Sequence, residues 1–406
     1  MNLVNILASL VVINENNLNN VPLSGIDQVV KTIIEFFSFG GVIGIGILLF
    51  SLCLKIIPLP LDIISRVSTK KNALKMEKMR PELEKLQKQY ANNKELYAKK
   101  MQALYKKEGY SMFASCLPTI LTLVFFIIVI SSFNRYSSYS NLDIYNKMAY
   151  EFNNTIVTDQ MVVENYDILD EEDNIITADG VIASIKLKTG KTITDDQINA
   201  VIKKAQDAAA LVYKAEIEKY EFWWIKNIWI SDSALKNSFI EEGSISSLFS
   251  YSNGCNPGDV ENELKDPDTF KLLTGSELLN DEKNQVNGYF ILIALSIGTM
   301  LLSQLITSKS QKAQMELQSV DGMNGQAAQT TKMMTWMMPI MFGFFAFMYS
   351  AAFSLYLIVS TVFSMLSTLI INKLTEKSFE KLVAKEEEAK YNQRYGHLIK
   401  NQKDED

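Results

Sequence analysis

The clearest pattern in the chain is a set of long stretches without any charged side chain, separated by segments rich in lysine and glutamate. Residues 36–54, 109–134, 284–308 and 333–372 contain no aspartate, glutamate, lysine or arginine. A helix needs about 20 apolar residues to cross the bilayer core. The last stretch would be roughly 60 Å long as a helix, which predicts two crossings with a turn at Ser350. The pattern therefore predicts five membrane spans.

The expected fold class is an all-α polytopic membrane protein with five transmembrane helices, a cytoplasmic helical hairpin and a small mixed α/β extracytoplasmic insert. The expected segments, in chain order, are an extracytoplasmic N-terminus with an interfacial amphipathic helix (1–35), the first span (36–61), the hairpin (62–108), the second span (109–134), an acidic extracytoplasmic domain (135–283), the third span (284–308), a cytoplasmic loop (309–332), the fourth and fifth spans (333–349 and 351–372) and a cytoplasmic tail (373–406).

Composition narrows the chemistry that the chain can carry. Apolar residues make up 48% of the chain and charged residues 21%, and their segregation excludes an ordinary soluble protein and a disordered chain. Three cysteines cannot form a disulfide framework, and a single histidine leaves a zinc site or a histidine-based triad almost nothing to use. The spans contain no acid–base or nucleophile–base pair, so we expect neither an enzyme nor a bound metal or cofactor.

Lysine and arginine in the connecting segments indicate the orientation. Segment 62–108 has 13 basic and 6 acidic residues, whereas segment 135–283 has 14 basic and 27 acidic residues. Short basic loops stay in the cytoplasm, while large loops are translocated largely regardless of charge. We therefore expect the N-terminus outside and the C-terminus in the cytoplasm.

Segment 62–108 predicts two antiparallel helices. Apolar residues recur every three or four positions, which is the period of a helix-packing seam, and a matching stripe follows a turn at 91–93. Pro81 should kink or divide the first helix, because proline removes a backbone hydrogen bond. The surrounding charges form either a solvated face or a docking surface for anionic lipid or RNA-rich partners. The hairpin residues of interest are Met79, Pro81, Leu83 and Tyr105.

The acidic segment 135–283 is long enough for a small domain. Residues 155–164 and 181–188 alternate like strands, and residues 193–221 predict a long helix that begins with a capping box at Thr194.

The segment 222–230 has an aromatic density that fits the membrane–water interface, with a local core of the outer domain as the alternative. Its tryptophans are Trp223, Trp224 and Trp229.

Lys55 is the only charge inside any predicted span. A lysine near the bilayer centre costs about 2.5–3.5 kcal/mol on insertion scales. One interpretation is a lysine that extends to the cytoplasmic headgroups. The other is a positive charge that lines a water-filled recess open to the cytoplasm. Polar side chains in the other spans fit a recess, although hydroxyls in membrane helices often bond only to their own backbone.

Several passages, taken in order, resemble the YidC-type membrane protein insertases, the group that includes the Oxa-type proteins. They are KIIPLPL at 55–61, KMEKMRPELEKLQKQY at 75–90, ALYKKEGYSMFASCLP at 103–118, FWWIKNIW at 222–229, WMMPIMFGFFAF at 336–347 and SLYLIVSTVFS at 354–364. The resemblance covers roughly 36–134, 221–231 and 284–373, and an insert at about 135–220 has no counterpart that we can place. The short N-terminal region resembles the Gram-positive or wall-less bacterial forms.

The resemblance implies a protein of the bacterial cell membrane that moves client transmembrane segments from the cytoplasm into lipid through a hydrophilic groove, without hydrolysing nucleotide. Lys55 stands at the position of the family's groove arginine, so the charge is kept while the planar guanidinium is lost. The resemblance assigns the client-binding groove to Lys55, Thr122, Tyr356, Ser360 and Ser364. It implies as partners nascent membrane proteins, membrane lipids, the ribosome and the Sec translocon, and no DNA. The tail 373–406 has eight basic and eight acidic residues and therefore no net charge. This argues against tight binding of the ribosome by the tail.

Two other functions remain open from the sequence. A secondary transporter could use Lys55 as a coupling charge, although it predicts two related halves that the sequence does not contain. A membrane-anchored binding protein would act through the acidic outer domain, and deletion of 140–215 would then abolish its activity, whereas an insertase would keep much of it.

Overall fold

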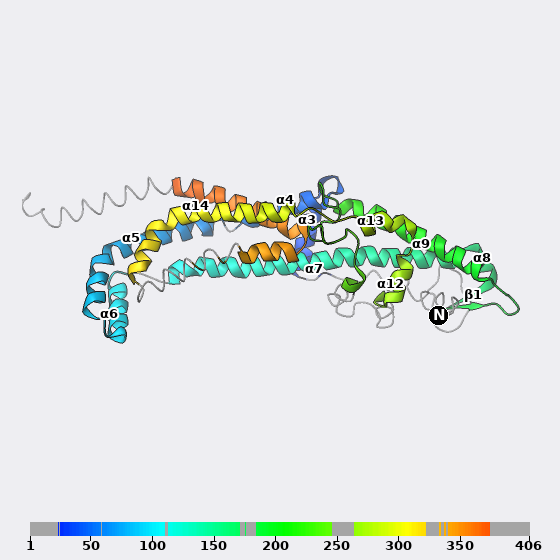
Figure 1. Cartoon of the computed structure of the whole chain (residues 1–406), viewed down its shortest axis with the longest axis horizontal. Helices are drawn as coiled ribbons and strands as arrows, with labels where there is room; N and C mark the ends of the chain where they lie inside the picture. Colours follow the sequence, from blue (N-terminus) through cyan, green and yellow to red (C-terminus); the bar gives the residue numbers. More distant parts are fainter. Residues whose placement is uncertain are drawn as a thin grey trace, which may run out of the picture. The chain divides into compact units, whose positions relative to one another are not determined.

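The computed structural model describes residues 23, 25–57, 59–109, 113–170, 175, 184–245, 264–321, 333, 337 and 340–373. Figure 1 shows the helices and strands of the described residues, coloured along the sequence. The chain divides into two compact units. Unit 1 consists of Met1–Ser51, Phe125–Ser296 and Phe342–Leu357, and unit 2 consists of Leu52–Val124, Ile297–Met341 and Ile358–Asp406. Each unit is assembled from segments that are far apart in the sequence.

The described part of the chain is mostly helical. Its named elements are α3 (Ile26–Phe36), η1 (Phe39–Gly41), α4 (Ile43–Ile56), α5 (Leu59–Gln89), α6 (Lys94–Lys107), α7 (Phe113–Thr158), α8 (Gln160–Asn165), β1 (Tyr166–Leu169), β2 (Ser184–Leu187), α9 (Asp195–Ile217), η2 (Glu218–Tyr220), η3 (Glu242–Ser244), α12 (Pro267–Leu273), η4 (Glu277–Leu279), α13 (Asn280–Asn284) and α14 (Ile291–Asp321). Two further helical segments cover 340–348 and Ala351–Lys373.

Among the described residues, two helices are long and apolar enough to cross a bilayer, namely Ile291–Ser308 within α14 and Ala351–Lys373. The apolar helix α4 has only 14 residues. Residues 113–134 of the predicted second span belong to α7, a helix of 46 residues. The count of five spans therefore stays a prediction.

The long helix α7 corrects one expectation for the acidic segment. Residues 155–164 alternate like a strand, but they form the end of α7, the cap residue Asp159 and most of α8. The Asp159 carboxylate accepts a hydrogen bond from the Met161 backbone N–H at 2.9 Å and so begins α8. Ile156 and Val162 are buried. Burial on one face and a cap decide the conformation here, and alternation alone does not.

Two other expectations for this segment are confirmed. Strand β2 lies inside the predicted range 181–188 and pairs antiparallel with β1, with Tyr166 opposite Leu187. Helix α9 begins with the predicted capping box, in which the Thr194 hydroxyl and the Gln197 side chain each accept the other's backbone N–H. The buried face of α9 includes Ala205, Ala209 and Tyr213.

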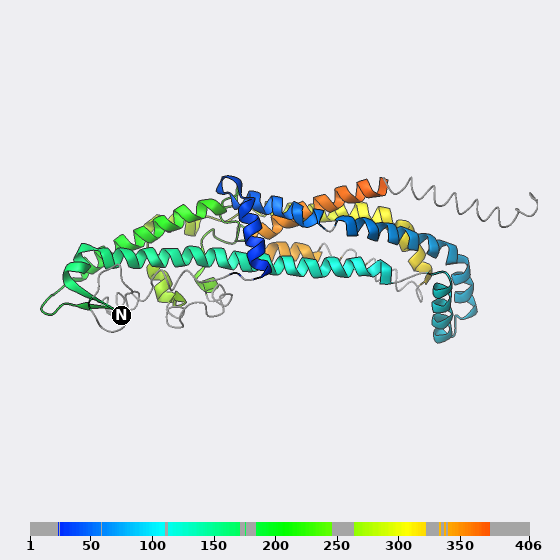
Figure 2. The ribbon, with the colours of Figure 1, turned by 180° about the vertical axis from the view of Figure 1, so that it is seen from behind.

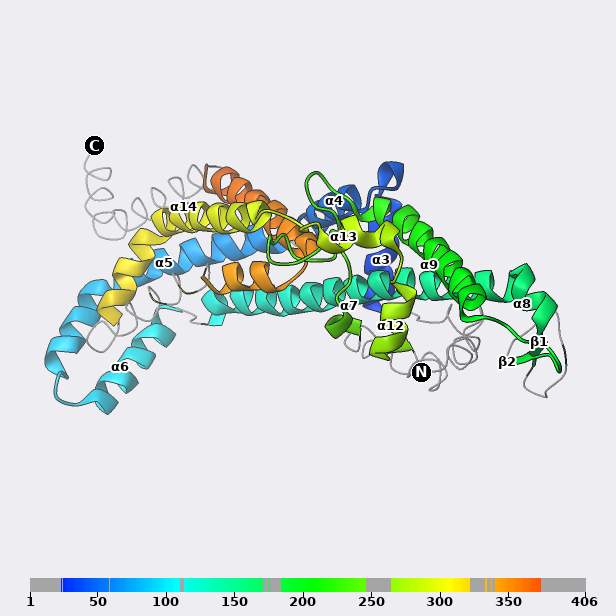
Figure 3. The ribbon, with the colours of Figure 1, turned by 45° about the vertical axis from the view of Figure 1, so that its right-hand side comes forward.

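In unit 2, α5 and α6 form a helical hairpin (Figure 3). Asn93 caps α6 by accepting a hydrogen bond from the Leu96 backbone N–H at 3.1 Å. Pro81 does not divide α5, which is helical on both sides of it. The hairpin core contains five of the apolar residues that recur at the helix-packing period, together with Tyr105. The buried cluster is Met79, Leu83, Leu104 and Tyr105, with Leu86 and Met101 packed against it.

A close contact in unit 1 requires a glycine. A Cβ atom at Gly44 of α4 would lie 2.2 Å from Cδ2 of the buried Phe222 ring. Gly298 of α14, by contrast, has nothing within 4 Å of such an atom.

We expect Gly44→Ala to lower the free energy of unfolding by about 1–3 kcal/mol, because the Phe222 ring must move. Gly298→Ala is the matched control, and we expect it to be neutral or stabilising by up to about 1 kcal/mol, because alanine favours helix over glycine. Chemical denaturation in detergent, followed by circular dichroism, measures both. An equal response of the two variants would contradict the packing role of Gly44.

Candidate functional site

The structure places the predicted groove residues on three helices. Lys55 lies in the last turn of α4 and is half-buried. A lysine there also complements the partial negative charge of the helix C-terminus. Thr122 lies within α7, and its side chain is outside the described residues. Ser360 is buried and Ser364 half-buried on the helix Ala351–Lys373.

Tyr356 is a core residue of unit 1. It is 2% exposed, and its ring centroid lies 5.7 Å from that of Phe133 and 6.1 Å from that of Phe353. Tyr356 belongs to unit 1, whereas Lys55, Ser360 and Ser364 belong to unit 2. Positions 356, 360 and 364 are four residues apart and so share one face of the helix, and this face is buried at Tyr356.

The aromatic segment contains two different environments. Trp223 is 73% exposed, has a left-handed φ of 54° and stacks on Phe222 with a centroid distance of 4.9 Å. Trp224 is half-buried. Trp229 is only 3% exposed and packs against Tyr136 at 4.6 Å between ring centroids. Trp229 therefore fits the alternative of a local core. Of the three tryptophans, only Trp223 and, in part, Trp224 are exposed enough to contact the membrane–water interface.

Residues 227–232 and Asn287 form a set of buried polar contacts, which we call the collar. Two carbonyl groups of the collar receive the first backbone N–H groups of the helix Ala351–Lys373: Ala351 donates to Ile230 and Ala352 to Ile228, each at 2.9 Å. A helix N-terminus otherwise leaves such groups unpaired. The Ser137 hydroxyl of α7 donates to the Trp229 carbonyl at 3.0 Å. The collar therefore joins α7 to the start of the last helix.

Asn287 is fully buried and is hydrogen-bonded on both sides of its amide. Its Oδ1 accepts from the Asn227 backbone N–H at 2.7 Å. Its Nδ2 lies 2.9 Å from the Asn227 carbonyl, and 3.0 Å from each of the Ile230 and Ser231 carbonyls. The Asn287 side chain thus joins residues 227–231 to the segment that precedes α14.

Asp232 makes the second connection to α14. Its carboxylate is fully buried and accepts hydrogen bonds from the backbone N–H groups of Tyr289, at 2.8 Å, and Leu292. A carboxylate at this position also interacts favourably with the helix dipole. A Cβ atom at Gly288 would lie 1.9 Å from Oδ1 of Asp232, so the approach needs glycine. Sequence analysis missed the collar, and the only local signal was a set of uncharged or acidic polar residues at the borders of apolar runs.

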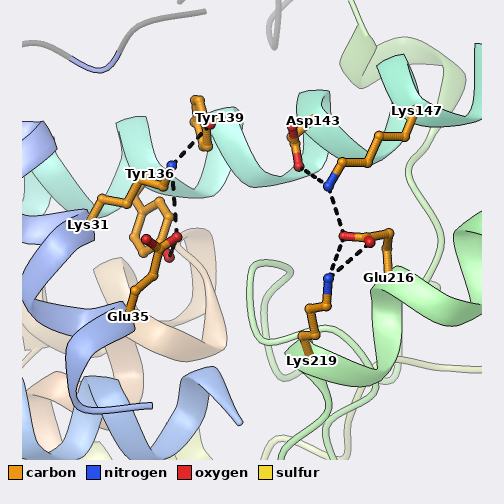
Figure 4. Close-up of polar contacts among 8 residues, drawn as sticks. All are labelled: Lys31, Glu35, Tyr136, Tyr139, Asp143, Lys147, Glu216 and Lys219. Atoms are coloured by element: carbon orange, nitrogen blue, oxygen red, sulfur yellow. Dashed lines mark hydrogen bonds and ion pairs between the residues drawn. The ribbon is translucent and has the colours of Figure 1, made fainter. Parts of the chain in front are cut away.

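A polar cavity of about 430 Å³ lies in unit 1, between α3, α7 and the end of α9 (Figure 4). Three lysines, three carboxylates and three tyrosines contribute to its wall. The lining residues are Lys31, Glu35, Ser38, Gly41, Ile43, Tyr136, Tyr139, Ser140, Asp143, Lys147, Glu216, Lys219 and Tyr220.

The charged side chains at this cavity form ion pairs within and between α7, α9 and η2 (Figure 4). The ribbon in Figure 2 shows the dark blue α3 crossing the long helix α7. Lys147 lies 2.8 Å from Asp143 and 3.0 Å from Glu216, and Lys219 lies 2.9 Å from Glu216. Burial lowers the pKa of Lys147, but its hydrogen bonds to the two carboxylates outweigh this and leave that pKa raised. Burial raises the pKa of Glu216, and its bonds to the two lysines reverse that effect and leave it lowered. Lys147 and Glu216 are therefore both charged at neutral pH.

On α3, Lys31 faces the same cavity. Its Nζ donates to the Tyr139 hydroxyl at 3.1 Å and lies 4.4 Å from the centroid of the Tyr139 ring. The Tyr136 hydroxyl donates to Glu35 at 3.3 Å. Burial raises the pKa of Tyr136, so that this hydroxyl keeps its proton. No group of three or more histidine, cysteine, aspartate or glutamate side chains suited to a metal occurs among the described residues.

The model of the 60Kd inner membrane protein family matches residues 35–178 and 201–378 of this chain. The match includes most of the insert at 135–220 for which sequence analysis found no counterpart, and leaves 179–200 unmatched between its two parts.

Curated relatives agree with this match. The chain is similar to membrane protein insertase YidC 1 of Streptococcus pyogenes, with 36% identity over 121 residues, 28% of this chain and 42% of the relative. It is 31% identical to membrane protein insertase YidC of Treponema denticola over 28% of this chain and 19% of the relative, and 31% identical to that of Enterococcus faecalis over 25% and 37%. The chain thus spans less than half the length of these relatives. No solved structure matches the chain significantly.

Proposed function

Because this chain belongs to the 60Kd inner membrane protein family, the YidC/Oxa family, we propose that it is a membrane protein insertase and chaperone. The family match over most of the chain is the observation that carries this proposal. The apolar helices Ile291–Ser308 and Ala351–Lys373 support a location in the membrane.

In the proposed mechanism, a client enters from the cytoplasm and its apolar helix moves into lipid beside the last span. A hydrophilic groove holds the polar segment that must cross, because desolvation of such a segment in lipid is costly. Lys55 attracts acidic client residues, and Ser364 offers its hydroxyl group to the client backbone, whereas Ser360, one turn earlier, is buried. The half-buried positions of Lys55 and Ser364 support this assignment, since both side chains are partly accessible. No nucleotide hydrolysis is needed in this mechanism.

The rest of the proposed organisation follows the sequence expectations. The chain crosses the membrane five times, with its N-terminus outside and its C-terminus in the cytoplasm. The α5–α6 hairpin receives clients, and the ribosome and the Sec translocon are transient partners. The transporter and outer-domain alternatives lose support, because the family match includes both the apolar helices and the hairpin region.

Site-specific photocrosslinking tests the insertase function. Ser364 and Leu366 are suitable probe positions, since Ser364 is half-buried and Leu366 is 51% exposed, whereas Tyr356 is buried. A single-span client on a stalled ribosome is presented to the reconstituted full chain. We expect crosslinks from both positions to the apolar segment of the client, which fade once the client is released into lipid.

Leu278 provides the control position for this experiment, because it is exposed in η4 of unit 1, outside every predicted span. We expect no crosslink to the apolar client segment from Leu278. Reactive probes that leave positions 364 and 366 uncrosslinked, or that crosslink equally from Leu278, would remove the support for an exit path along the last helix.

A further inference from the structure

The cavity between α3, α7 and the end of α9 has no part in the proposed insertion mechanism. We propose that it is a binding site for the headgroup of a zwitterionic phospholipid, in which the lysines receive the phosphate and the carboxylates receive the ammonium group.

The first argument is the balance of charge around the cavity. Three ammonium groups and three carboxylates line it, so that the wall has no net charge but has strong local fields of both signs. A purely anionic ligand would be opposed by the carboxylates, and a purely cationic ligand by the lysines. A headgroup that carries one phosphate and one ammonium satisfies both sets. The charged lining residues are Lys31, Glu35, Asp143, Lys147, Glu216 and Lys219.

The second argument is that the ion pairs in the wall can exchange partners at low cost. The side chains of Lys147 and Lys219 are 45% and 50% exposed. Glu216, the carboxylate that both lysines contact, is 19% exposed. Ion pairs with a solvent-exposed member contribute little net stability, because water screens them. A ligand that offers a phosphate to the lysines and an ammonium to the carboxylates can therefore replace these pairs and still leave the partly buried Glu216 with a cationic partner.

The third argument is the aromatic wall. Tyr136, Tyr139 and Tyr220 line the same cavity as the carboxylates. The Lys31 ammonium already lies 4.4 Å from the centroid of the Tyr139 ring, so a cation over a tyrosine face occurs here within the protein itself. An ammonium group of a ligand can use the same kind of contact.

The fourth argument is the position of the cavity along the chain. Gly41 and Ile43 contribute to its lining. Ile43 is the first residue of α4, and α4 lies within the first predicted span (36–61). The adjoining α3 keeps its polar residues Lys31 and Glu35 toward the cavity while Ile26, Val29 and Phe36 are exposed on its surface. Exposed apolar residues on an amphipathic helix fit the boundary between headgroups and acyl chains. A lipid is therefore favoured over a soluble ligand.

Native mass spectrometry of the purified full chain in detergent tests this site. Short-chain phosphatidylethanolamine is the zwitterionic probe, phosphatidylglycerol is the anionic probe, and glycerophosphoethanolamine is the same headgroup without acyl chains. We expect one phosphatidylethanolamine to be retained, with an affinity at least tenfold above that of the other two. Equal retention of phosphatidylglycerol, or equal affinity for the acyl-free headgroup, would overturn the assignment to a zwitterionic lipid.

Variants test whether the lipid occupies this cavity. The double variant Lys31→Gln with Lys219→Gln should weaken phosphatidylethanolamine binding at least tenfold, while the conservative Lys219→Arg should keep it. Lys204→Gln is the matched control, because Lys204 lies on α9, the helix directly before η2 in the chain, and pairs with Asp159 at 2.7 Å, outside the cavity lining. Thermal denaturation by circular dichroism checks that each variant is folded. Unchanged binding in a folded double variant, or an equal loss in Lys204→Gln, would contradict the site. The result does not depend on insertase activity.

Discussion

Replacement of Asn287 by alanine is expected to lower the free energy of unfolding by about 3–5 kcal/mol. The side chain is fully buried and makes hydrogen bonds to the backbone of Asn227, Ile230 and Ser231. Each buried polar group left without a partner costs about 1–3 kcal/mol. Two of the groups released by Asn287→Ala, the Asn227 N–H and the Ser231 carbonyl, belong to buried residues. The Ile230 and Asn227 carbonyls still accept hydrogen bonds from the Ala351 and Ile230 backbone N–H groups. The loss is a large part of the 5–15 kcal/mol that typically stabilises a domain.

Denaturation in detergent, followed by tryptophan fluorescence, measures this effect, because Trp229 is buried in the collar. Asn284→Ala is the matched control. The Asn284 side chain donates only a local hydrogen bond to the Asn280 carbonyl within α13, at 2.8 Å, and this bond is exposed. We expect the control to change stability by less than about 0.5 kcal/mol. Similar losses in both variants would show that the collar contributes no more than an ordinary surface hydrogen bond.

Reversal of the charge at Lys55 is expected to reduce the insertion of clients with acidic translocated segments about tenfold or more. The proposed groove charge would then repel the segment that it normally attracts, and at an effective dielectric constant of about 20 a charge pair at about 4 Å interacts by about 4 kcal/mol. Lys55→Arg keeps the charge and should keep most of the activity, although its planar guanidinium hydrogen-bonds differently. Protease protection of a single-span client in vesicles measures insertion.

A structural role for Lys55 must be separated from a role in the groove, because its position in the last turn of α4 is also favourable to the helix dipole. Two clients that differ only in the charge of their tail distinguish these two roles. Lys55→Glu should impair a client with an acidic tail far more than the same client with a neutral tail. Lys191→Glu makes the same charge change at an exposed loop position and should leave both clients unaffected. Equal impairment of the two clients by Lys55→Glu would refute the proposed charge interaction.

Some parts of the candidate site could be predicted because they depend on local sequence. Lys55 was identified as a single charge in a long apolar stretch, and the hairpin seam from the recurrence of apolar residues such as Met79 and Leu83. The capping box at Thr194 is a signal within four residues. Burial of Tyr356 was not predicted, and burial of Trp229 only as the alternative to an interface, because an aromatic residue with one polar atom is compatible with both an interface and a core.

The sequence by itself determined that this is a helical membrane protein, since hydropathy is a sum over neighbouring residues and needs no knowledge of distant contacts. It also determined the α5–α6 pairing, because two helices joined by a short turn can bury their matching apolar stripes against each other. Only the tertiary structure decided the collar and the polar cavity. Asn227 and Asn287 are 60 positions apart, and Lys31 and Tyr139 are 108 apart. Contacts over such separations form only when long segments fold back on each other, and no pattern within one segment specifies them.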